Sequence, residues 1–519
     1  MAGKPTSYAL LSVSDKTGIV PLAKSLDSLG FKIISTGGTA KTLTDSGLSV
    51  IPIRDITGNP ESFDQRMKTI SFQIESGILF DRTNSTHIKE ARKLNIKPID
   101  IVVCNLYPFE QTVQNPKITI DRAIESIDVG GPTMVRAAAK NFKNVLVVVD
   151  PKDYENITNV LQTNSVTDRF RQELSAKAFG HLSFYDAQIA GYLRREQFPQ
   201  EIALPGRKTI DLRYGENPHQ KAVVYFEPNT NSPLKNLQKL TGRELSYVNF
   251  TDIAAGLEEV RIFNSPCAVV IKHNSPSGLA LGTSTALALK RAVEADPESA
   301  FGGVIVLNKS LDIKTAKTFA SFKEKNGVLI DIVAAPQITS QAKEFIKTVR
   351  KTTGIYTFGD IPKKRSNTTH LKFFDGGFVA QEWDDEINLD KWRVATKVKP
   401  TKKQLMQMKL AWKFIGRVKS NSIVVVDKNL PMTRGIGSGQ TSRIRAARIA
   451  LEQGKKYAKG AILASDSFFP FDDCVKLAHK YGIGAIIQQG GSINDKASII
   501  AADKAGIPMI FTSQRKFWH

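Results

Sequence analysis

A lysine and a histidine stand side by side at the end of an apolar run, in the segment PCAVVIKHNSPSG. An imidazole titrates near neutral pH, and a neighbouring cation lowers the pKa of such a ring. Lys272 and His273 therefore form a pair suited to proton transfer, and the ammonium group can also stabilise negative charge. The alternative interpretation is a lysine and a hydrogen-bonding histidine at a strand end, with no part in catalysis.

The residues around this pair indicate how it is positioned. The run from Pro266 to Ile271 predicts a short buried strand, and Pro276 and Gly278 predict that regular structure ends soon afterwards. Polar side chains that follow such a strand lie at the carboxyl edge of a sheet, where open α/β folds bind their ligands. We therefore expect the pair to face a binding cleft.

Two loops of small residues, SVSDKTG at 12–18 and STGGTAK at 35–41, each follow a predicted strand and open onto a predicted helix. Backbone N–H groups, hydroxyl groups and the helix dipole favour a phosphate there, and glycine lets the backbone approach it closely. Ordinary N-caps and turns are the alternative interpretation. The candidate phosphate ligands are Ser12, Lys16, Thr36, Gly37 and Gly38. No GxxxxGK[ST] motif is present, so ATP hydrolysis is not predicted.

Residue types that bind oxyanions and move protons recur between positions 66 and 140. They form one site only if the fold brings them together. The group consists of Arg66 and Lys68 in DQRMKT, Tyr107 after an apolar strand, Asp128 in SIDVGGP and Lys140 in RAAAKN.

In the C-terminal half, polar and aromatic segments accompany the Lys272–His273 pair. The segment SDSFFPFDD predicts an apolar wall beside an acid, which suits a planar heterocycle, although core packing of the phenylalanines explains the same pattern. The candidate residues are Arg213 and Tyr214 in LRYGENPHQ, Phe301 and Gly302 in SAFGGVIV, Asn421 in SNSIVVV, Arg443 after GIGSGQTS, and Phe468 and Asp473.

Neither a metal centre nor a disulfide framework is predicted. The seven histidines are scattered and form no HExxH motif, so we expect no catalytic zinc. Three distant cysteines in 519 residues favour a reducing cytoplasm. No apolar stretch approaches the ~20 residues of a membrane helix, and we expect no secretory signal.

The net charge of +22 is the unusual total. Basic proteins attract polyanions, which include nucleic acids, anionic membranes and phosphorylated or polycarboxylate small molecules. The densest basic patches, at 363–365 and 397–403, lack the interleaved aromatic residues of a single-strand-binding groove. We interpret them as solvated surface and expect neither a nucleic-acid nor a membrane partner.

Strand and helix patterns alternate over the first ~150 residues, which predicts parallel βαβ units and an α/β fold. The stretch 151–200 is predicted to be helical, and Pro199 to Pro205 is predicted to be a linker. A second α/β region begins at LRYGENPHQ, and the alternation resumes from about 404. No repeat of fixed period is evident in the sequence.

Taken together, these segments resemble the bifunctional purine biosynthesis family that combines phosphoribosylaminoimidazolecarboxamide (AICAR) formyltransferase with inosine monophosphate (IMP) cyclohydrolase. The match extends from SVSDKTG to FTSQRKFWH and covers nearly the whole chain. Its most specific motifs are NLYPF, IDVGGPTMVRAAAKN, LRYGENPHQ, IKHNSPSG, AFGG, SDSFFPFDD, IIQQGGSINDK and the closing arginine-aromatic-histidine tail.

The resemblance implies two activities. The C-terminal part would transfer a formyl group from 10-formyltetrahydrofolate to AICAR, giving formyl-AICAR (FAICAR). The N-terminal part would then close the ring of FAICAR with loss of water, giving IMP. It implies a Rossmann-like, methylglyoxal-synthase-like domain with a helical extension at 1–200, and two cytidine-deaminase-like α/β halves without zinc at 201–375 and 376–519. A cytoplasmic homodimer with transferase sites drawn from both subunits, and a structural monovalent cation, are implied as well.

The resemblance also assigns roles to residues. His273 would be the base for the accepting amine, Lys272 would hold the imidazole neutral, and Asn421 would bind the formyl oxygen or the carboxamide. In the cyclohydrolase, the oxyanion and the protons would be handled by Lys68, Tyr107, Asp128 and Lys140. Phosphate, nucleotide and folate would be bound by Ser12, Lys16, Thr36, Gly37, Gly38, Arg66, Arg213, Tyr214, Asn249, Phe301, Gly302, Arg443, Phe468, Asp473 and Arg515.

One segment departs from the family pattern. Where the family has KTLHPxxHGGIL, this chain has KTISFQIESGIL, so Ser71, Phe72 and Glu75 replace His, Pro and His. The family's KNH is KNF here, with Phe142. The phosphate and catalytic matches survive, so we still expect a working cyclohydrolase.

Two alternatives stay open. In the first, a working formyltransferase carries an inactive, phosphate-binding N-terminal domain. In the second, the chain is a basic nucleic-acid-binding protein on an old enzyme fold, which predicts binding with a steep salt dependence. The lack of a concentrated basic stripe with stacking residues counts against the second alternative.

Overall fold

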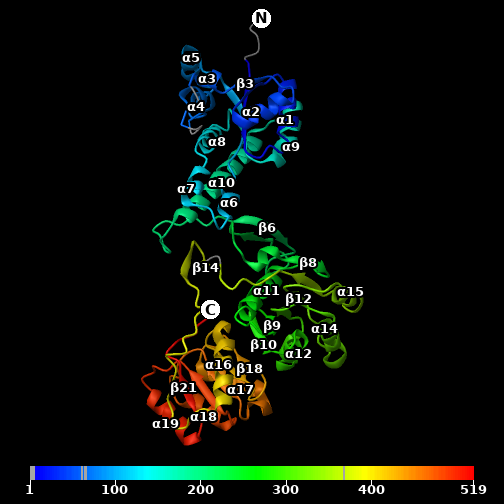
Figure 1. Cartoon of the computed structure of the whole chain (residues 1–519), viewed down its shortest axis with the longest axis vertical. Coiled ribbons are helices and arrows are strands. Elements are labelled where there is room, and N and C mark those ends of the chain that lie inside the picture. The colour runs from blue at the N-terminus through cyan, green and yellow to red at the C-terminus, as the bar shows by residue number, and fades with distance from the viewer. Residues whose placement is uncertain (1–5, 60–61, 64–66, 366–368) are drawn as a thin grey trace. The chain divides into compact units, whose positions relative to one another are not determined.

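The structure is a computed structural model that describes residues 6–59, 62–63, 67–365 and 369–519. The chain forms two compact units (Figure 1). The N-terminal unit extends to Arg207 and takes in Glu227–Asn229, and the C-terminal unit consists of Lys208–Phe226 and Thr230–His519. Among the described residues, no helix is long and apolar enough to cross a membrane.

The N-terminal unit is built on a five-stranded sheet in the order β3-β2-β1-β4-β5, and its strands run parallel. The strands are short and mostly apolar because both faces of a parallel sheet are covered. The strand order reverses between β1 and β4, so a crevice opens at their carboxyl ends. The prediction of parallel βαβ units is confirmed. The strands are β1 (Tyr8–Val13), β2 (Lys32–Ser35), β3 (Val50–Pro52), β4 (Ile99–Asn105) and β5 (Leu146–Val148).

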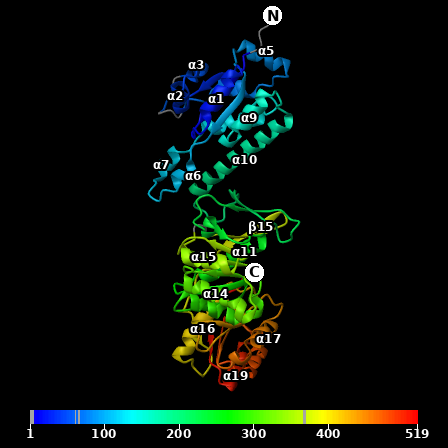
Figure 2. The same cartoon turned by 90° about the vertical axis from the view of Figure 1, so that its right-hand side faces the viewer.

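Helices cover this sheet and share one apolar core with it. The long α10, seen along its length in Figure 2, packs against α8 and β5. The helices are α1 (Ile19–Ser28), α2 (Gly37–Asp45), α3 (Arg54–Thr57), α4 (Phe72–Leu79), α5 (Ser85–Lys93), α6 (Phe109–Val113), α7 (Ile120–Glu125), α8 (Gly130–Lys140), α9 (Tyr154–Gln162) and α10 (Asp168–Leu193).

The C-terminal unit contains two six-stranded sheets with matching strand orders, β10-β9-β11-β12-β13-β8 and β18-β17-β19-β20-β21-β16. In each sheet the first two strands form a hairpin, and the second strand of that sheet order is also antiparallel to the third. The third, fourth and fifth strands are parallel to one another, and the last strand is antiparallel to the fifth. The unit therefore contains two copies of one structural repeat. The sequence does not reveal the repeat, because an apolar strand pattern preserves a fold without preserving residue identity.

The first half of this unit contains β6 (Arg207–Leu212, which begins at the last residue of the N-terminal unit), β7 (Ala222–Phe226), β8 (Gln238–Thr241), α11 (Tyr247–Val260), β9 (Cys267–Lys272), β10 (Ser275–Leu281), α12 (Thr285–Ala295), α13 (Pro297–Ala300), β11 (Val304–Leu307), α14 (Ile313–Asn326), β12 (Ile332–Ala335), α15 (Ser340–Val349) and β13 (Gly354–Thr357). A separate hairpin follows, made of β14 (Thr369–Phe374) and β15 (Gly377–Glu382). The second half contains β16 (Arg393–Val394), α16 (Lys402–Phe414), β17 (Ile423–Val426), β18 (Thr433–Gly437), α17 (Arg443–Gly454), β19 (Ile462–Ser465), α18 (Asp473–Lys480), β20 (Ala485–Gln488), α19 (Asp495–Ala505) and β21 (Met509–Phe511).

The two sheets meet at the outer strands of their hairpins. Ala280 of β10 pairs in an antiparallel bridge with Met432, just before β18, and the Leu281 N–H donates to the Pro431 carbonyl at 2.8 Å. Because this contact is antiparallel, the carboxyl end of β9 lies at the same edge as the amino end of β17. Residues from both halves can therefore share a site there.

Regular structure does not stop at Pro276 and Gly278, which both lie within β10, so that prediction is wrong. His273 and Asn274 form a two-residue turn, and β10 follows it with a bulge between Pro276 and Gly278. Both neighbours of β9 are antiparallel to it. The Lys272–His273 pair thus lies at a hairpin tip rather than at the end of a parallel strand.

Candidate functional site

A cavity of about 510 Å³ opens at the carboxyl ends of β1, β2 and β4 in the N-terminal unit. Its wall combines the loop after β1, the start of α2 and the segment that leads into α8. Of the predicted residues, it gathers Ser12, Lys16, Thr36, Gly37, Gly38, Lys68, Tyr107 and Asp128. Both phosphate loops and most of the proton-handling group therefore share one cavity.

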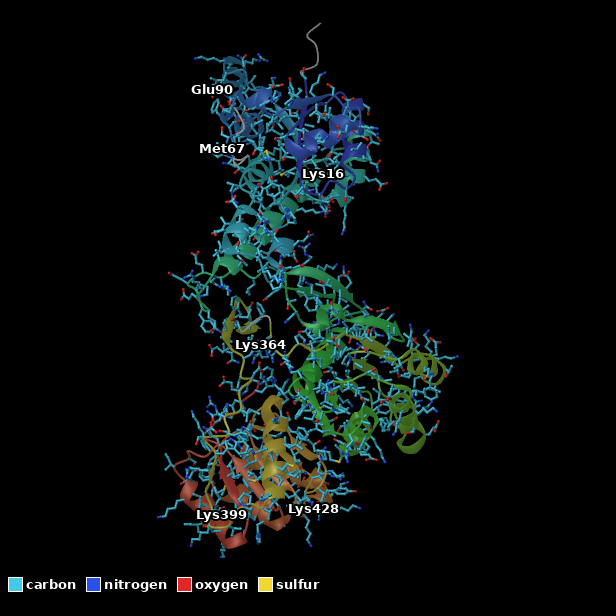
Figure 3. The ribbon with its side chains drawn as sticks, viewed as in Figure 1. Lys16, Met67, Glu90, Lys364, Lys399 and Lys428 are labelled. Carbon is cyan, nitrogen blue, oxygen red and sulfur yellow. The ribbon has the colours of Figure 1, made fainter. Side chains whose placement is uncertain are left out.

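Two lysines face the start of α2. The N-cap residue is Thr36, whose buried hydroxyl has no hydrogen-bond partner among the described residues. A Cβ on Gly38 would lie 3.6 Å from Lys16 Nζ, and one on Gly37 would lie 3.7 Å from Lys68 Nζ. Two ammonium groups, a hydroxyl group and the positive end of a helix thus converge, a combination that suits a phosphate. Figure 3 labels Lys16 in this unit.

Asn105, the last residue of β4, holds the loop after β1 in place. Its Oδ1 accepts the backbone N–H groups of Ser14 (2.6 Å) and Asp15 (2.8 Å), and its Nδ2 donates to the Asp15 carbonyl (2.9 Å). Thr39 Oγ1 clamps the same loop by accepting the Val13 N–H at 3.1 Å. Sequence reasoning missed Asn105, although it carries one signal: a polar residue that ends an otherwise apolar strand.

Asp128 lies just before α8 and close to Lys68. Its Oδ1 accepts the Gly131 N–H at 2.9 Å, and its own N–H donates to the Tyr185 hydroxyl at 2.8 Å. Burial raises the pKa of Asp128, while the N–H groups of Gly131 and Tyr107 and the charge of Lys68 oppose that rise. A carboxyl group balanced in this way beside an ammonium group can exchange a proton with a bound substrate.

One residue predicted for this group does not line the cavity. Lys140 is the exposed last residue of α8, whereas Gly130 at the other end of that helix lines the cavity. Ten residues of α-helix span about 15 Å, so the structure does not bring Lys140 to Asp128. Arg66 lies outside the described residues.

In the C-terminal unit, Lys272 and His273 lie at the tip of the β9–β10 hairpin. His273 and Asn274 have φ angles of 53° and 58°, the positive values that a tight two-residue turn requires. The Asn274 N–H donates to Asp252 Oδ1 at 2.7 Å, and Lys272 Nζ donates to the Phe301 carbonyl at 2.8 Å. Non-glycine residues seldom adopt such angles, and surrounding contacts must hold them.

Asp252 of α11 bonds to this hairpin and lies close enough to Lys419, which precedes β17, to feel its charge. Burial raises the pKa of Asp252, and hydrogen bonds from the hairpin turn and the nearby charges of His273 and Lys419 oppose the rise. Lys419 stands two residues before Asn421, whose Nδ2 donates to the Gln440 carbonyl at 2.8 Å. His273 and Asn421 therefore lie around the same edge. Sequence reasoning missed Asp252 and Lys419, because their role depends on a long-range contact.

The other predicted residues of the first half belong to neighbouring elements. Arg213 stacks on Tyr214, with Cζ 4.6 Å from the ring centroid, and Asn249 forms a capping box with Ser246 at the start of α11. Gly302 follows Phe301 with a φ of 71°. Phe301 is the predicted residue that contacts the Lys272 side chain directly.

In the second half, Phe468 is half-buried and Asp473 begins α18, where its Oδ1 accepts the Cys474 N–H at 2.7 Å. Arg515 is exposed and lies over the ring of Phe517, with Cζ 4.4 Å from its centroid. Within the described part of the chain, no hydrogen bond or ion pair joins Phe468 or Asp473 to the β9–β10 hairpin tip.

Arg443, predicted to bind phosphate or carboxamide, is only 7% exposed. It forms an ion pair with the fully buried Asp466, and its Nη1 also donates to the Ser422 carbonyl at 3.3 Å. Asp466 Oδ2 in turn accepts the Ser422 N–H at 3.0 Å. In this structure the guanidinium group joins elements of the second sheet and is not presented to a ligand.

Comparison with known families decides what the two units are. A family model described as "AICARFT/IMPCHase bienzyme" matches residues 138–453, more than half of the chain, and a model described as "MGS-like domain" matches residues 18–133. The chain belongs to the AICARFT/IMPCHase bienzyme family. The resemblance drawn from the motifs is confirmed, and so is the α/β fold with an MGS-like N-terminal domain.

Curated relatives match over nearly the full length. The bifunctional purine biosynthesis protein PurH of Acetivibrio thermocellus is 45% identical over 519 residues, which cover 98% of this chain and 99% of that protein. The PurH protein of Thermoanaerobacter sp. is 44% identical over 517 residues, with the same coverage. A solved structure described as "Crystal structure of ForH" aligns with 36% of this chain and 98% of that chain, at 34% identity and a TM-score of 0.32.

The segment that departs from the family pattern forms an intact helix. Ser71 is the N-cap of α4 and accepts the Ile74 N–H at 3.2 Å, and Phe72 is exposed. Burial raises the pKa of Glu75 to about 7, and its Oε1 has no partner among the described residues. Phe142 follows Asn141, which donates to the Ile78 carbonyl of α4 at 2.6 Å. The replacements are thus accommodated locally.

The basic stretches do not gather into one stripe. Lys364 and Lys399, one from each stretch, lie well apart in the C-terminal unit (Figure 3). A nucleic-acid groove needs basic residues that follow one path. This separation disfavours the nucleic-acid-binding alternative.

Proposed function

We propose that this chain catalyses the last two steps of IMP synthesis. A formyl group passes from 10-formyltetrahydrofolate to AICAR, and the FAICAR product closes to IMP with loss of water. Membership of the bienzyme family supports both activities. The observation that carries the cyclohydrolase is the cavity in which Lys16, Lys68 and Thr36 converge beside Asp128.

In ring closure, the nucleotide phosphate binds at the start of α2. The carboxamide nitrogen of FAICAR bonds to the formyl carbon and gives up a proton, and the formyl oxygen becomes an oxyanion. Lys68 stabilises this oxyanion, and Asp128 moves the proton. The oxygen then leaves as water with the hydrogen of the formamide nitrogen. Because the reaction is intramolecular, positioning by the cavity supplies much of the rate.

In formyl transfer, the amine of AICAR bonds to the formyl carbon and passes its proton to His273. The bond between this carbon and N10 of the folate breaks, and N10 takes up a proton. Lys272 keeps two N–H donors beyond its bond to Phe301 and stabilises the negative charge that develops. Asn421, at the same edge, orients the carboxamide or the formyl oxygen.

A folate-type cosubstrate follows from the formyltransferase activity, and we infer 10-formyltetrahydrofolate as that cosubstrate. We also infer a cytoplasmic homodimer with transferase sites drawn from both subunits, and membership of the bienzyme family supports this inference. A bound monovalent cation remains part of the proposal, and small molecules are the partners.

A coupled assay tests the proposal. Wild-type protein given AICAR and 10-formyltetrahydrofolate should form IMP, and protein given FAICAR alone should form IMP faster than the spontaneous reaction. Lys68→Ala should lose the second reaction and keep the first. Formation of FAICAR without accelerated closure would instead support the alternative of an inactive N-terminal domain.

A further inference from the structure

The last residues of the chain lie against the segment that carries Asn421. The Ser420 N–H donates to the Trp518 carbonyl at 2.8 Å, and the Lys516 N–H donates to the Asp466 carbonyl at 2.8 Å. Lys516 is only 3% exposed, and its Nζ binds both carboxylate oxygens of Asp384 at 2.8 Å. The tail is therefore anchored within the fold immediately beside Ser420.

The Trp518 side chain belongs to an aromatic stack formed by Trp518, His370 and Trp383. The His370 ring lies 5.0 Å from the Trp518 ring at an interplanar angle of 11°, and 4.3 Å from the Trp383 ring. Arg417 lies over Trp518, with Cζ 4.8 Å from the centroid, and Arg365 lies 3.7 Å over Trp383. Stacked rings capped by guanidinium groups are attractive contacts in a partly buried setting.

Acidic side chains fix the two arginines. Asp385 accepts from Arg417 Nη2 at 2.7 Å and from Arg365 Nε at 2.7 Å, and Glu258 of α11 also pairs with Arg365. Burial and the nearby charges of Arg417, Arg365 and Lys372 lower the pKa of His370, while Glu258 opposes that shift. The neutral imidazole is thus the stable form, and it stacks without adding charge. The stack joins the β14–β15 hairpin, the tail and the start of the second sheet.

The segment from Lys419 to Asn421 is consequently held from two sides. On one side the Gly439 N–H donates to the Lys419 carbonyl at 2.7 Å, and the Gln440 carbonyl accepts the Asn421 side chain at 2.8 Å. On the other side only the Trp518 carbonyl is bonded to the described backbone of this segment. The Trp518 ring in the stack and the buried Lys516, two residues before it, anchor the part of the tail that carries this carbonyl.

We propose that Trp518 is a positioning residue for formyl transfer: its ring, held in the stack with His370 and Trp383, places the carbonyl that aligns Ser420 and, through it, Asn421. This proposal rests on the proposed role of Asn421 in the transferase. Trp518 touches no reacting atom, so it acts on the turnover step through the geometry of its neighbour.

The first test compares Trp518→Ala, Trp518→Phe and a control, Phe373→Ala. Phe373 lies on the same β14–β15 hairpin, is 69% exposed and is not part of the stack. Trp518→Ala should lower kcat of formyl transfer about tenfold with a smaller change in KM, because alignment rather than binding is lost. Trp518→Phe should restore most of kcat, and Phe373→Ala should match wild type. Cyclisation of supplied FAICAR should stay unchanged in all three.

The second test combines Trp518→Ala with Asn421→Ser. If Trp518 acts through Asn421, the double variant should transfer formyl groups no more slowly than Asn421→Ser alone. The proposal would be overturned if the fold-losses in kcat of the two single variants multiplied in the double variant. A wild-type kcat in Trp518→Ala would also overturn it. Equal loss of both activities in Trp518→Ala would also overturn it, because general unfolding would explain that result.

Two further outcomes separate this inference from the proposed function. Wild-type activity of Asn421→Ser would reject the role of Asn421 and this inference with it. Failure of wild-type protein to make FAICAR would reject the proposed function itself.

Discussion

The two units hold their candidate residues in different ways. In the N-terminal unit, residues from three neighbouring parallel strands and their loops line one cavity at a single sheet edge. In the C-terminal unit, His273 comes from the end of β9 and Asn421 from the start of β17, in two different sheets. The first site needs one sheet to form, whereas the second depends on how two sheets are joined. Distant residues should therefore affect the second site more than the first.

The largest expected effect comes from His273→Ala, which should abolish one activity and leave the other intact. Loss of a general base lowers turnover by about 10²–10⁴-fold, and formyl transfer should fall by that factor. Cyclisation of supplied FAICAR should be unchanged, because it uses the N-terminal cavity. Steady-state assays of each half-reaction measure both. Near-wild-type transfer would show that His273 is not the base.

Next in size is Asp466→Asn, which tests how much the second sheet depends on one buried ion pair. Leaving the Arg443 guanidinium without its partner should cost the C-terminal unit about 3–5 kcal/mol of unfolding free energy. Urea unfolding followed by the two activities should show transfer lost at lower denaturant, with cyclisation retained to the wild-type midpoint. A matched loss of both activities would contradict independent units. Asp45→Asn, on the surface of α2, is the control.

A smaller, pH-dependent effect is expected for Glu259→Gln. Both carboxyl oxygens of Glu259 lack partners among the described residues, and burial raises its pKa from 4.5 to about 8. Between these pH values the unfolded chain loses the proton first, so wild-type stability falls as pH rises and levels off above pH 8. The variant lacks this titration and should be about 3 kcal/mol more stable than wild type at pH 7, with little difference at pH 4.

Denaturant unfolding of the C-terminal unit at several pH values measures this difference. Glu294→Gln, on the surface of α12, should show no comparable dependence. A gap between Glu259→Gln and wild type that stays constant from pH 4 to pH 8 would contradict the assignment.

The smallest expected effect tests whether the N-terminal cavity binds the nucleotide phosphate at Thr36. Thr36→Val removes a hydroxyl group that has no partner in the described structure, so folding should be unaffected. If the hydroxyl binds the nucleotide phosphate, KM for FAICAR should rise about tenfold, the value of one hydrogen bond to a charged group. Thr44→Val, exposed on the same helix, is the control. An unchanged KM would place the phosphate elsewhere.

The sequence predicts the N-terminal unit better than the C-terminal one, for a physical reason. Loops after parallel strands converge by rule, so Lys16 and Thr36 could be grouped from their positions along the chain alone. Lys140 could not be placed, because a helix separates it from the cavity by its whole length. The same reasoning fails for β10, where Pro276 and Gly278 look like breakers. A bulge accommodates the proline, and the absence of a side chain at Gly278 lets the strand approach the Ala292 carbonyl of α12.

Arg443 illustrates the other limit of sequence reasoning. An arginine after a glycine-rich turn has the pattern of a ligand-binding residue, but the charge of Arg443 is paired with Asp466, 23 residues further along the chain. Burial of both partners depends on the packing of β17 and β19, which no local pattern encodes. Asp252 and Lys419 were missed for the same reason, since each gains its role only when the two halves meet.

The matching strand orders of the two sheets have a consequence for how the enzyme can be altered. By register, Asp427 stands in the second sheet where Lys272 stands in the first, and its hairpin is longer. Asp427 is paired with Arg434 at 2.7 Å, so the duplicate position carries a salt bridge where the first sheet carries the Lys272 amine. The chain thus contains a second copy of the strand corner that we propose for formyl transfer, and a new activity could be engineered into it without altering the first copy.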